Sequence, residues 1–154
     1  MIIDINTLSV VFDTNNNRHC DFAPVKKWLD ERKGFLVFGG TKYKKELKET
    51  YRYLRLIRLM SDGGMAKAIK DEIVDEFERN IVKQTIGTDC DDQHIIAMIC
   101  ASRCTLLCSL DKRSFQFIKD KTLYPPNFPT VKIYSSTRNR NLLMAKSRNL
   151  TNII

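Results

Sequence analysis

The sequence has no long apolar run. Its most continuous apolar stretches, 95–101 and 105–110, are each only a few residues long. A helix needs about 20 consecutive apolar residues to cross a bilayer, so the sequence predicts no membrane span. The first residues include no Lys or Arg, and Asp4 interrupts their apolar run, which argues against a signal peptide. We therefore expect a cytoplasmic protein with no membrane partner.

Histidine is scarce, and the cysteines do not form the pairs that a zinc site needs. The chain has two His and five Cys. Cys100, Cys104 and Cys108 recur at every fourth residue among apolar neighbours, whereas zinc sites usually combine two separated ligand pairs. We expect reduced thiols that pack in the core. His19 and His94 lack a neighbouring nucleophile, so we interpret both as structural or surface residues and not as catalytic bases.

Acidic residues are absent after Asp120. The last 34 residues hold six Lys or Arg, and the whole chain of 154 residues carries a net charge of +8. A small basic protein favours an anionic partner such as a nucleic acid. The length corresponds to one domain. We place this domain at residues 1–134 and interpret residues 135–154 as a basic C-terminal tail or an appended helix.

Short apolar runs alternate with segments of helical periodicity. The expected strands are 1–5, 35–38, 105–110 and 131–134. The expected helices are 6–12, 22–33, 41–60, 65–83, 90–103 and 113–119. This alternation predicts an α/β fold with a parallel sheet covered by helices on both faces.

Three acidic residues stand at positions where a charge is costly. Asp4 and Asp111 follow expected strands, and the carboxyl ends of parallel strands are where ligands bind in open α/β sheets. Asp92 shares a helix face with Ile96 and Ile99. Clustered carboxylates repel one another unless a cation neutralises them, and with no Cys/His set the oxygen-preferring ions Mg²⁺ and Mn²⁺ fit best. An acidic metal site in a basic protein indicates a nuclease.

Four motifs in this order resemble the PIN-domain ribonucleases over roughly residues 1–134. They are Asp4 with Asn6 after the first strand, Thr41-Lys-Tyr-Lys-Lys-Glu46-Leu47, Asp89-Cys-Asp-Asp92-Gln-His-Ile-Ile-Ala97, and Ser109-Leu-Asp111-Lys-Arg-Ser-Phe115. The resemblance implies a three-layer α/β/α sandwich with a small, mainly parallel sheet. It also implies a Mg²⁺- or Mn²⁺-dependent endoribonuclease, and many members of this family are toxins of toxin–antitoxin pairs.

The resemblance assigns the four acids of the family's metal site. They are Asp4, Glu46, Asp92 and Asp111. Two of these assignments leave alternatives open, because Glu49 lies one turn from Glu46, and Asp89 and Asp91 lie close to Asp92. Asn6 and Ser109 match polar positions that support the acids in the family, although each is also an ordinary turn or cap residue.

Basic residues surround one of the assigned acids. The 41–60 segment carries Lys42, Lys45 and Arg52 beside Glu46, and we interpret these three as contacts to an RNA backbone. Arg138 and Arg140 in the C-terminal segment are predicted to do the same. The apolar residues Leu142, Leu143, Leu150 and Ile153 leave open that this segment instead binds a protein partner or a second copy of the chain.

The sequence thus predicts a metal-dependent endoribonuclease that cleaves single-stranded RNA, as a toxin or an RNA-processing enzyme. A nuclease acting on DNA or structured nucleic acid remains an alternative, because the same acids can cut either polymer. So does a non-catalytic PIN-like module that binds RNA or protein. An antitoxin or inhibitor protein and a homodimer are the other partners that the resemblance implies.

Overall fold

The computed structural model describes residues 1–144 and contains a five-stranded sheet in which all strands are parallel. The strands are β1 (Ile2–Ile3), β2 (Leu36–Gly39), β3 (Ala66–Ile69), β4 (Leu106–Cys108) and β5 (Lys132–Tyr134). Their order across the sheet is β3-β2-β1-β4-β5, so β1 is central. Ile2 pairs with Val37 on one side and Leu107 on the other, and both isoleucines of β1 are fully buried.

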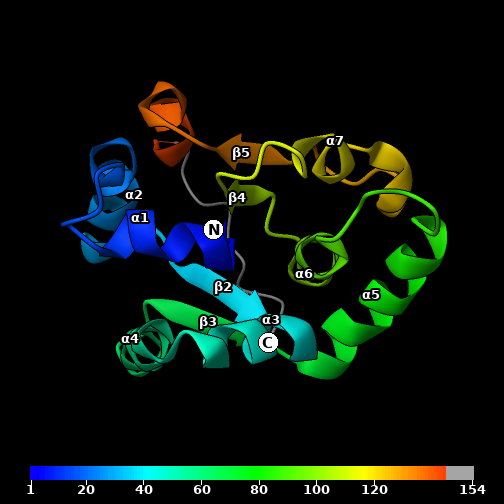
Figure 1. The fold of residues 1–154 in the computed structure, drawn as a ribbon, viewed down its shortest axis with the longest axis horizontal. Helices are drawn as coiled ribbons and strands as arrows, with labels where there is room; N and C mark the ends of the chain where they lie inside the picture. Colours follow the sequence, from blue (N-terminus) through cyan, green and yellow to red (C-terminus); the bar gives the residue numbers. More distant parts are fainter. Residues whose placement is uncertain (145–154) are drawn as a thin grey trace.

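Helices cover both faces of this sheet. The first half of the chain contributes η1 (Ile5–Thr7), α1 (Leu8–Phe12), α2 (His19–Asp30), α3 (Thr41–Glu49) and α4 (Tyr51–Asp62). The second half contributes α5 (Asp71–Gln84), α6 (Gln93–Ser102), α7 (Phe115–Ile118), η2 (Lys121–Leu123) and η3 (Thr137–Leu143). In Figure 1, α1, α2 and α4 lie to the left of the sheet, and α5, α6 and α7 lie to its right. This arrangement is the expected three-layer α/β/α sandwich.

The densest part of the core lies around α6. Every residue of this helix from His94 to Ser102 is buried, and the helix packs against α5, β2 and β3. Cys100, Cys104 and Cys108 are buried as free thiols, as the sequence predicted. Burial raises the pKa of Cys100 to about 12, so this thiol is protonated and inert at neutral pH. The three cysteines therefore serve packing.

Two segments differ from the sequence-based prediction. Residues 65–83 were predicted to form one helix, but Ala66–Ile69 form the edge strand β3, and the helix begins only at Asp71. The strand forms because Ala66 to Ile69 pair residue by residue with Leu36 to Gly39, a partner that local periodicity does not show. Acidic Asp71 and Glu72 in the first turn then favour a helix start by interacting with its dipole.

The predicted 41–60 helix is also interrupted, at Thr50. Its backbone leaves the helical region, and its hydroxyl donates to the carbonyl of Leu47 at 3.0 Å. Threonine hydroxyls compete in this way with the backbone bonds of a helix. The break turns α4 away from α3, so α4 packs along β3 while α3 contacts η1, α5 and α6.

Smaller differences concern element ends and the C-terminal segment. Helix α2 begins at His19, earlier than predicted, and contains Pro24. The predicted tail begins with η3, which contacts α2 and β5. The basic residues Lys146 and Arg148 and the apolar Leu150 and Ile153 lie outside the described residues. No helix of residues 1–144 has the length and apolar composition that crossing a bilayer requires.

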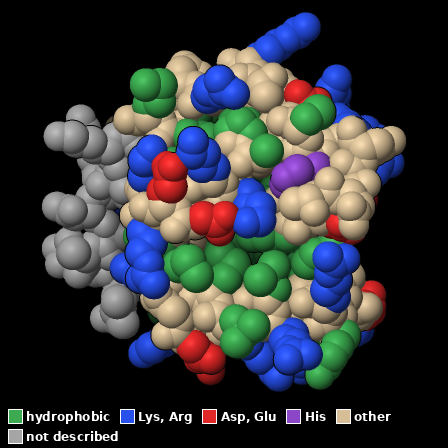
Figure 2. All heavy atoms as spheres, turned by 90° about the vertical axis from the view of Figure 1, so that its left-hand side faces the viewer, with side chains coloured by type: hydrophobic (Ala, Val, Ile, Leu, Met, Phe, Trp, Pro, Cys, Tyr) green, Lys and Arg blue, Asp and Glu red, His purple; other side chains and the backbone are tan. Residues whose placement is uncertain are grey.

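One broad surface is partly apolar. Seen from the side of α1, α2 and α4, hydrophobic side chains form a band across the middle of the molecule, with Lys and Arg on either side (Figure 2). Tyr51 and Leu59 of α4 are among the exposed large hydrophobic residues, at 71% and 60% exposure.

Candidate active site

The strand order creates a topological switch point between β1 and β4. The chain passes from β1 to β2 and β3 on one side of the sheet, and then returns to β4 and β5 on the other. In open α/β sheets the crevice at such a point, outside the carboxyl ends of the strands, is where ligands bind. Asp4 directly follows β1, and its N–H donates to the carbonyl of Cys108 at 3.0 Å. Ser109 directly follows β4.

Asp4 is the most deeply buried acid of this crevice, with 6% of its surface exposed. Its Oδ2 accepts a hydrogen bond from the Ser109 hydroxyl at 3.0 Å, and its Oδ1 accepts one from the backbone N–H of Asn6 at 3.3 Å. Burial raises the pKa of Asp4; the two hydrogen bonds oppose this rise, and the charges of Asp111 and Asp91 add to it. Ser109 therefore supports Asp4 as expected, whereas Asn6 acts through its backbone.

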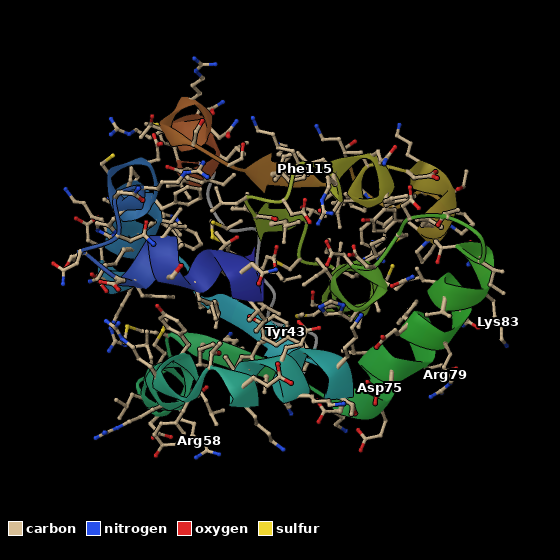
Figure 3. The ribbon with its side chains drawn as sticks, viewed as in Figure 1. Tyr43, Arg58, Asp75, Arg79, Lys83 and Phe115 are labelled. Atoms are coloured by element: carbon tan, nitrogen blue, oxygen red, sulfur yellow. The ribbon has the colours of Figure 1, made fainter. Side chains whose placement is uncertain are left out.

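A buried tyrosine connects α3 to the strand that carries Asp4. The Tyr43 hydroxyl donates to the carbonyl of Ile3 at 2.7 Å, and the ring is fully buried between α3 and the sheet (Figure 3). This contact holds α3 against the carboxyl end of β1. Glu46 follows on the same helix, one turn after Tyr43.

Glu46, and not Glu49, faces the crevice. Burial raises the pKa of Glu46, the charge of Lys42 opposes this, and the charges of Asp4 and Asp91 add to it. Glu49 is exposed on the outer side of α3. Burial and the coupling to Asp4 therefore favour Glu46 over Glu49 as the site residue, and that assignment stays a prediction.

His94 is a neighbour of Glu46 that sequence reasoning did not connect to the site. Its ring is buried with 3% exposure, and its Nε2 lies 3.5 Å from the Glu46 Oε2. Burial, with the nearby charge of Lys42, lowers the pKa of His94 to about 3, so the ring is neutral at pH 7. Its Nδ1 has no hydrogen-bond partner among residues 1–144. The only sequence signal was its place in the first turn of α6, two residues after Asp92.

Asp92 stands at the start of α6, with its carbonyl accepting the N–H groups of Ile95 and Ile96. Burial and the charges of Asp4 and Asp91 raise the pKa of its carboxyl to about 6, although a hydrogen bond from Ser114 opposes the rise. Asp91 is exposed, and its carbonyl accepts a hydrogen bond from the Lys42 Nζ at 3.0 Å. Asp92 is thus the less exposed of the two, and the charge of Asp91 also acts on Asp4.

Asp111 differs from the other acids because it already has a cationic partner. Arg113 forms a two-point contact with its carboxylate, Nε to Oδ1 and Nη2 to Oδ2, each at 3.2 Å. These hydrogen bonds lower the pKa of Asp111, against a small opposing effect of burial. The Asp111 N–H donates to the Ser109 hydroxyl at 3.1 Å, which links Asp111 to the partner of Asp4.

Three of the four predicted acids share one electrostatic environment, whereas Arg113 lowers the pKa of Asp111. Asp4, Glu46 and Asp92 all have raised pKa values, and Asp4 affects both others. An excess of carboxylates with oxygen donors only is the chemistry that Mg²⁺ and Mn²⁺ accept. Among residues 1–144, however, no three His, Cys, Asp or Glu side chains converge closely enough to form a finished metal cage. The oxygen donors of these residues fit Mg²⁺ and Mn²⁺. The carboxylate of Asp111, however, binds Arg113 in this structure.

Comparison of the chain with protein-family models, with curated proteins and with solved structures gave no match. Membership of the PIN-domain family therefore stays a prediction from the four sequence motifs. What this chain can do must be argued from the geometry of its own crevice.

The predicted nucleic-acid contacts fall in three places. Lys42 and Lys45 lie on α3 next to the acids and line a groove toward α5. Arg52 forms an ion pair with Asp13 at 3.3 Å. Arg138 and Arg140 belong to η3, beside β5 and therefore at the sheet edge opposite β3. Only the first pair adjoins the acidic crevice.

Proposed function

We propose that this chain is a metal-dependent endoribonuclease of the PIN type that cleaves single-stranded RNA. One observation carries the proposal: Asp4, Glu46 and Asp92, from three distant segments of the chain, all have raised pKa values, and the charge of Asp4 contributes to the rise in the other two. Keeping these three acids together costs folding free energy, because burial and repulsion raise their pKa values. A protein of net charge +8 that keeps such a cluster fits a function on a polyanion.

The residues that would hold Mg²⁺ or Mn²⁺ are Asp4, Glu46, Asp92 and Asp111. Their oxygen donors support this assignment. When bound, such an ion lowers the pKa of water and neutralises charge on a phosphoryl group. Arg113, which now neutralises Asp111, is 85% exposed, so it can leave Asp111 at little cost.

Neighbouring residues of the chain would orient these carboxylates. Ser109 and the backbone of Asn6 fix both oxygens of Asp4. Neutral His94 contacts Glu46. The hydrogen bond from the Tyr43 hydroxyl to Ile3 holds α3 against β1. Lys42, bound to the carbonyl of Asp91, places a positive charge at the rim where a substrate phosphate would approach. The crevice would thus offer acids in its floor and a cation at its entrance.

The test is cleavage of matched single-stranded RNA and DNA oligonucleotides by the full chain. We expect RNA to be cut in Mg²⁺ or Mn²⁺, little activity with Zn²⁺, and none in EDTA. Asp4→Asn should abolish cleavage. Asp62→Asn, which removes an exposed acid at the end of α4, is the matched control and should leave cleavage unchanged.

Two outcomes would contradict the proposal. Full activity after exhaustive chelation would exclude the metal mechanism. Equal activity of Asp4→Asn and wild type would exclude the crevice as the active site. Preferential cleavage of DNA would retain the site and change the substrate.

A further inference from the structure

A groove between α3 and α5 leads away from the acidic crevice. Its volume is about 560 Å³, and both helices contribute charged side chains to its walls. The charged residues of the walls are Lys42, Lys45, Asp75, Glu78, Arg79 and Lys83. The α5 residues were not singled out from the sequence, because α5 as a whole is mainly acidic in its first half.

One of the two acids of this groove, Asp75, is already engaged by hydrogen bonds. Both oxygens of Asp75 accept hydrogen bonds from Thr41, one from its N–H at 2.8 Å and one from its hydroxyl at 2.6 Å. Asp75 therefore stabilises the start of α3, whose first N–H groups need acceptors. Burial raises the pKa of Glu78, against the opposing charge of Lys42. The four Lys and Arg side chains of the groove nevertheless outnumber its two acids.

Three basic side chains of the groove are free to bind an anionic ligand. Lys45, Arg79 and Lys83 are exposed, and none of them forms an ion pair within residues 1–144. Arg79 and Lys83 lie one turn apart on α5, about 6 Å along the helix axis, and Figure 3 shows both along that helix beyond Asp75. The groove thus presents several positive charges without partners, which is the electrostatic pattern of a phosphate-binding surface.

Lys42 joins this groove to the acidic crevice. It lines the groove, its Nζ binds the carbonyl of Asp91, and it lies one turn before Glu46 on α3. The two sites are therefore continuous at Lys42. Val82 on the groove wall is 43% exposed, and Ile86 in the turn after α5 is 78% exposed. These apolar side chains offer a surface to the bases of an unpaired strand.

We propose that the α3–α5 groove binds the sugar–phosphate backbone of a single RNA strand as that strand leaves the acidic crevice. Lys45, Arg79 and Lys83 contact successive phosphates, and Lys42 holds the strand at the crevice entrance. The inference rests on the proposed function for the identity of the strand. The Lys and Arg side chains contact phosphates and not base edges. The groove therefore binds RNA without sequence preference.

The experiment measures RNA binding separately from cleavage. The full chain is titrated into a labelled single-stranded RNA in EDTA, from about 50 to 300 mM KCl. The test variant is Arg79→Ala/Lys83→Ala. The matched control is Arg55→Ala/Arg58→Ala, which removes the same charge from exposed positions on α4, on another part of the surface (Figure 3). Circular dichroism and thermal melting confirm that both variants are folded.

We expect the groove variant to bind RNA severalfold more weakly and to lower the slope of log affinity against log salt by about 1.4, roughly 0.7 for each lost contact. The control should keep the wild-type slope. Equal slopes for the two variants would overturn the inference, as would an unchanged RNA affinity accompanied by altered sedimentation, which would assign the groove to a protein contact. A wild-type chain that binds RNA through the groove yet does not cleave it in Mg²⁺ would instead contradict the proposed function alone.

Discussion

Asp92 is the acid whose titration matters most near neutral pH. Its pKa is raised to about 6 by burial and by the charges of Asp4, Asp91 and Asp111, with a hydrogen bond from Ser114 in opposition. A carboxyl with a raised folded-state pKa binds its proton more tightly in the folded protein than in the unfolded chain. The metal-free protein therefore loses stability as pH rises from about 4 to about 6, and the loss stays constant above that range.

Asp92→Asn should remove this pH-dependent loss. We expect the variant to gain about 2 kcal/mol of unfolding free energy over wild type at pH 7 in EDTA, and the gain to vanish at about pH 4. His94, with its pKa lowered to about 3, destabilises both proteins as pH falls below 6.5, so its effect cancels in the difference. Urea unfolding across this pH range is the measurement. A difference that does not change with pH would contradict the prediction.

Asp4→Asn tests whether the most buried acid is retained for a ligand. Without metal, the variant should be as stable as wild type or more stable, because a repelled, buried charge is removed while Ser109 keeps a partner. Mg²⁺ at ten times its dissociation constant should stabilise wild type by about 1.4 kcal/mol and leave the variant unaffected. Thermal melting with and without Mg²⁺ measures both effects. A large loss of stability of the variant in EDTA would show that Asp4 is structural.

At the scale of single elements, the position of α3 depends on the contact between Tyr43 and Ile3. Tyr43→Phe removes a buried hydroxyl that donates at 2.7 Å and should cost about 1–2 kcal/mol of unfolding free energy. Since α3 also carries Glu46, cleavage should fall by more than the folded fraction does. Tyr124→Phe, which removes a half-buried hydroxyl bound to Ile118 away from the crevice, is the control. Equal activity of the two folded variants would argue against a positioning role for Tyr43.

The turn between β2 and α3 imposes a second constraint on α3. Gly40 has φ +86°, and a Cβ there would lie 2.6 Å from the Cγ1 of Val74 on α5. Gly64 has a similar φ of +73° with no atom within 4 Å of such a Cβ. Gly64→Ala should therefore cost about 1 kcal/mol through backbone strain alone, and Gly40→Ala about 1–3 kcal/mol more. Chemical denaturation distinguishes the two, and equal costs would show that α5 moves aside freely.

At the scale of the whole molecule, the positive charge is divided between separate surfaces. Lys45, Arg79 and Lys83 surround the groove beside the acids, whereas Arg138 and Arg140 lie on η3 next to α2 and β5. The sequence predicted RNA contacts for Lys45, Arg138 and Arg140, but not for Arg79 and Lys83. Distance from the crevice separates the two surfaces in the folded protein.

Arg138→Ala/Arg140→Ala should therefore lower the salt slope of RNA binding by less than the groove variant does. A strand held at the crevice reaches the α3–α5 groove first, and surface charges farther than a Debye length, about 8 Å at physiological salt, are screened. The same titration measures this, with the α4 double variant as the control. A larger effect from η3 would instead place the strand across β5.

The sequence by itself determined the α/β class, the strands that became β1, β2, β4 and β5, and the acids that follow two of them. Apolar strand segments and the residues that start and end helices are local patterns. They can therefore be recognised without knowledge of the fold. Asp4 and Asp111 were found because acids directly after apolar strands are conspicuous in any context. The buried cysteines were predicted for the same local reason.

Tertiary structure alone decided the rest. β3 exists because β2 offers it a partner, and the helix predicted over 41–60 breaks where α4 turns to pack on β3. Three further features are relations between elements: the electrostatic coupling of Glu46 to Asp4, the contact of His94 with Glu46, and the groove that Lys45 and Arg79 both line. Packing free energy fixes which helix face meets which neighbour, and that choice depends on residues far apart in the chain.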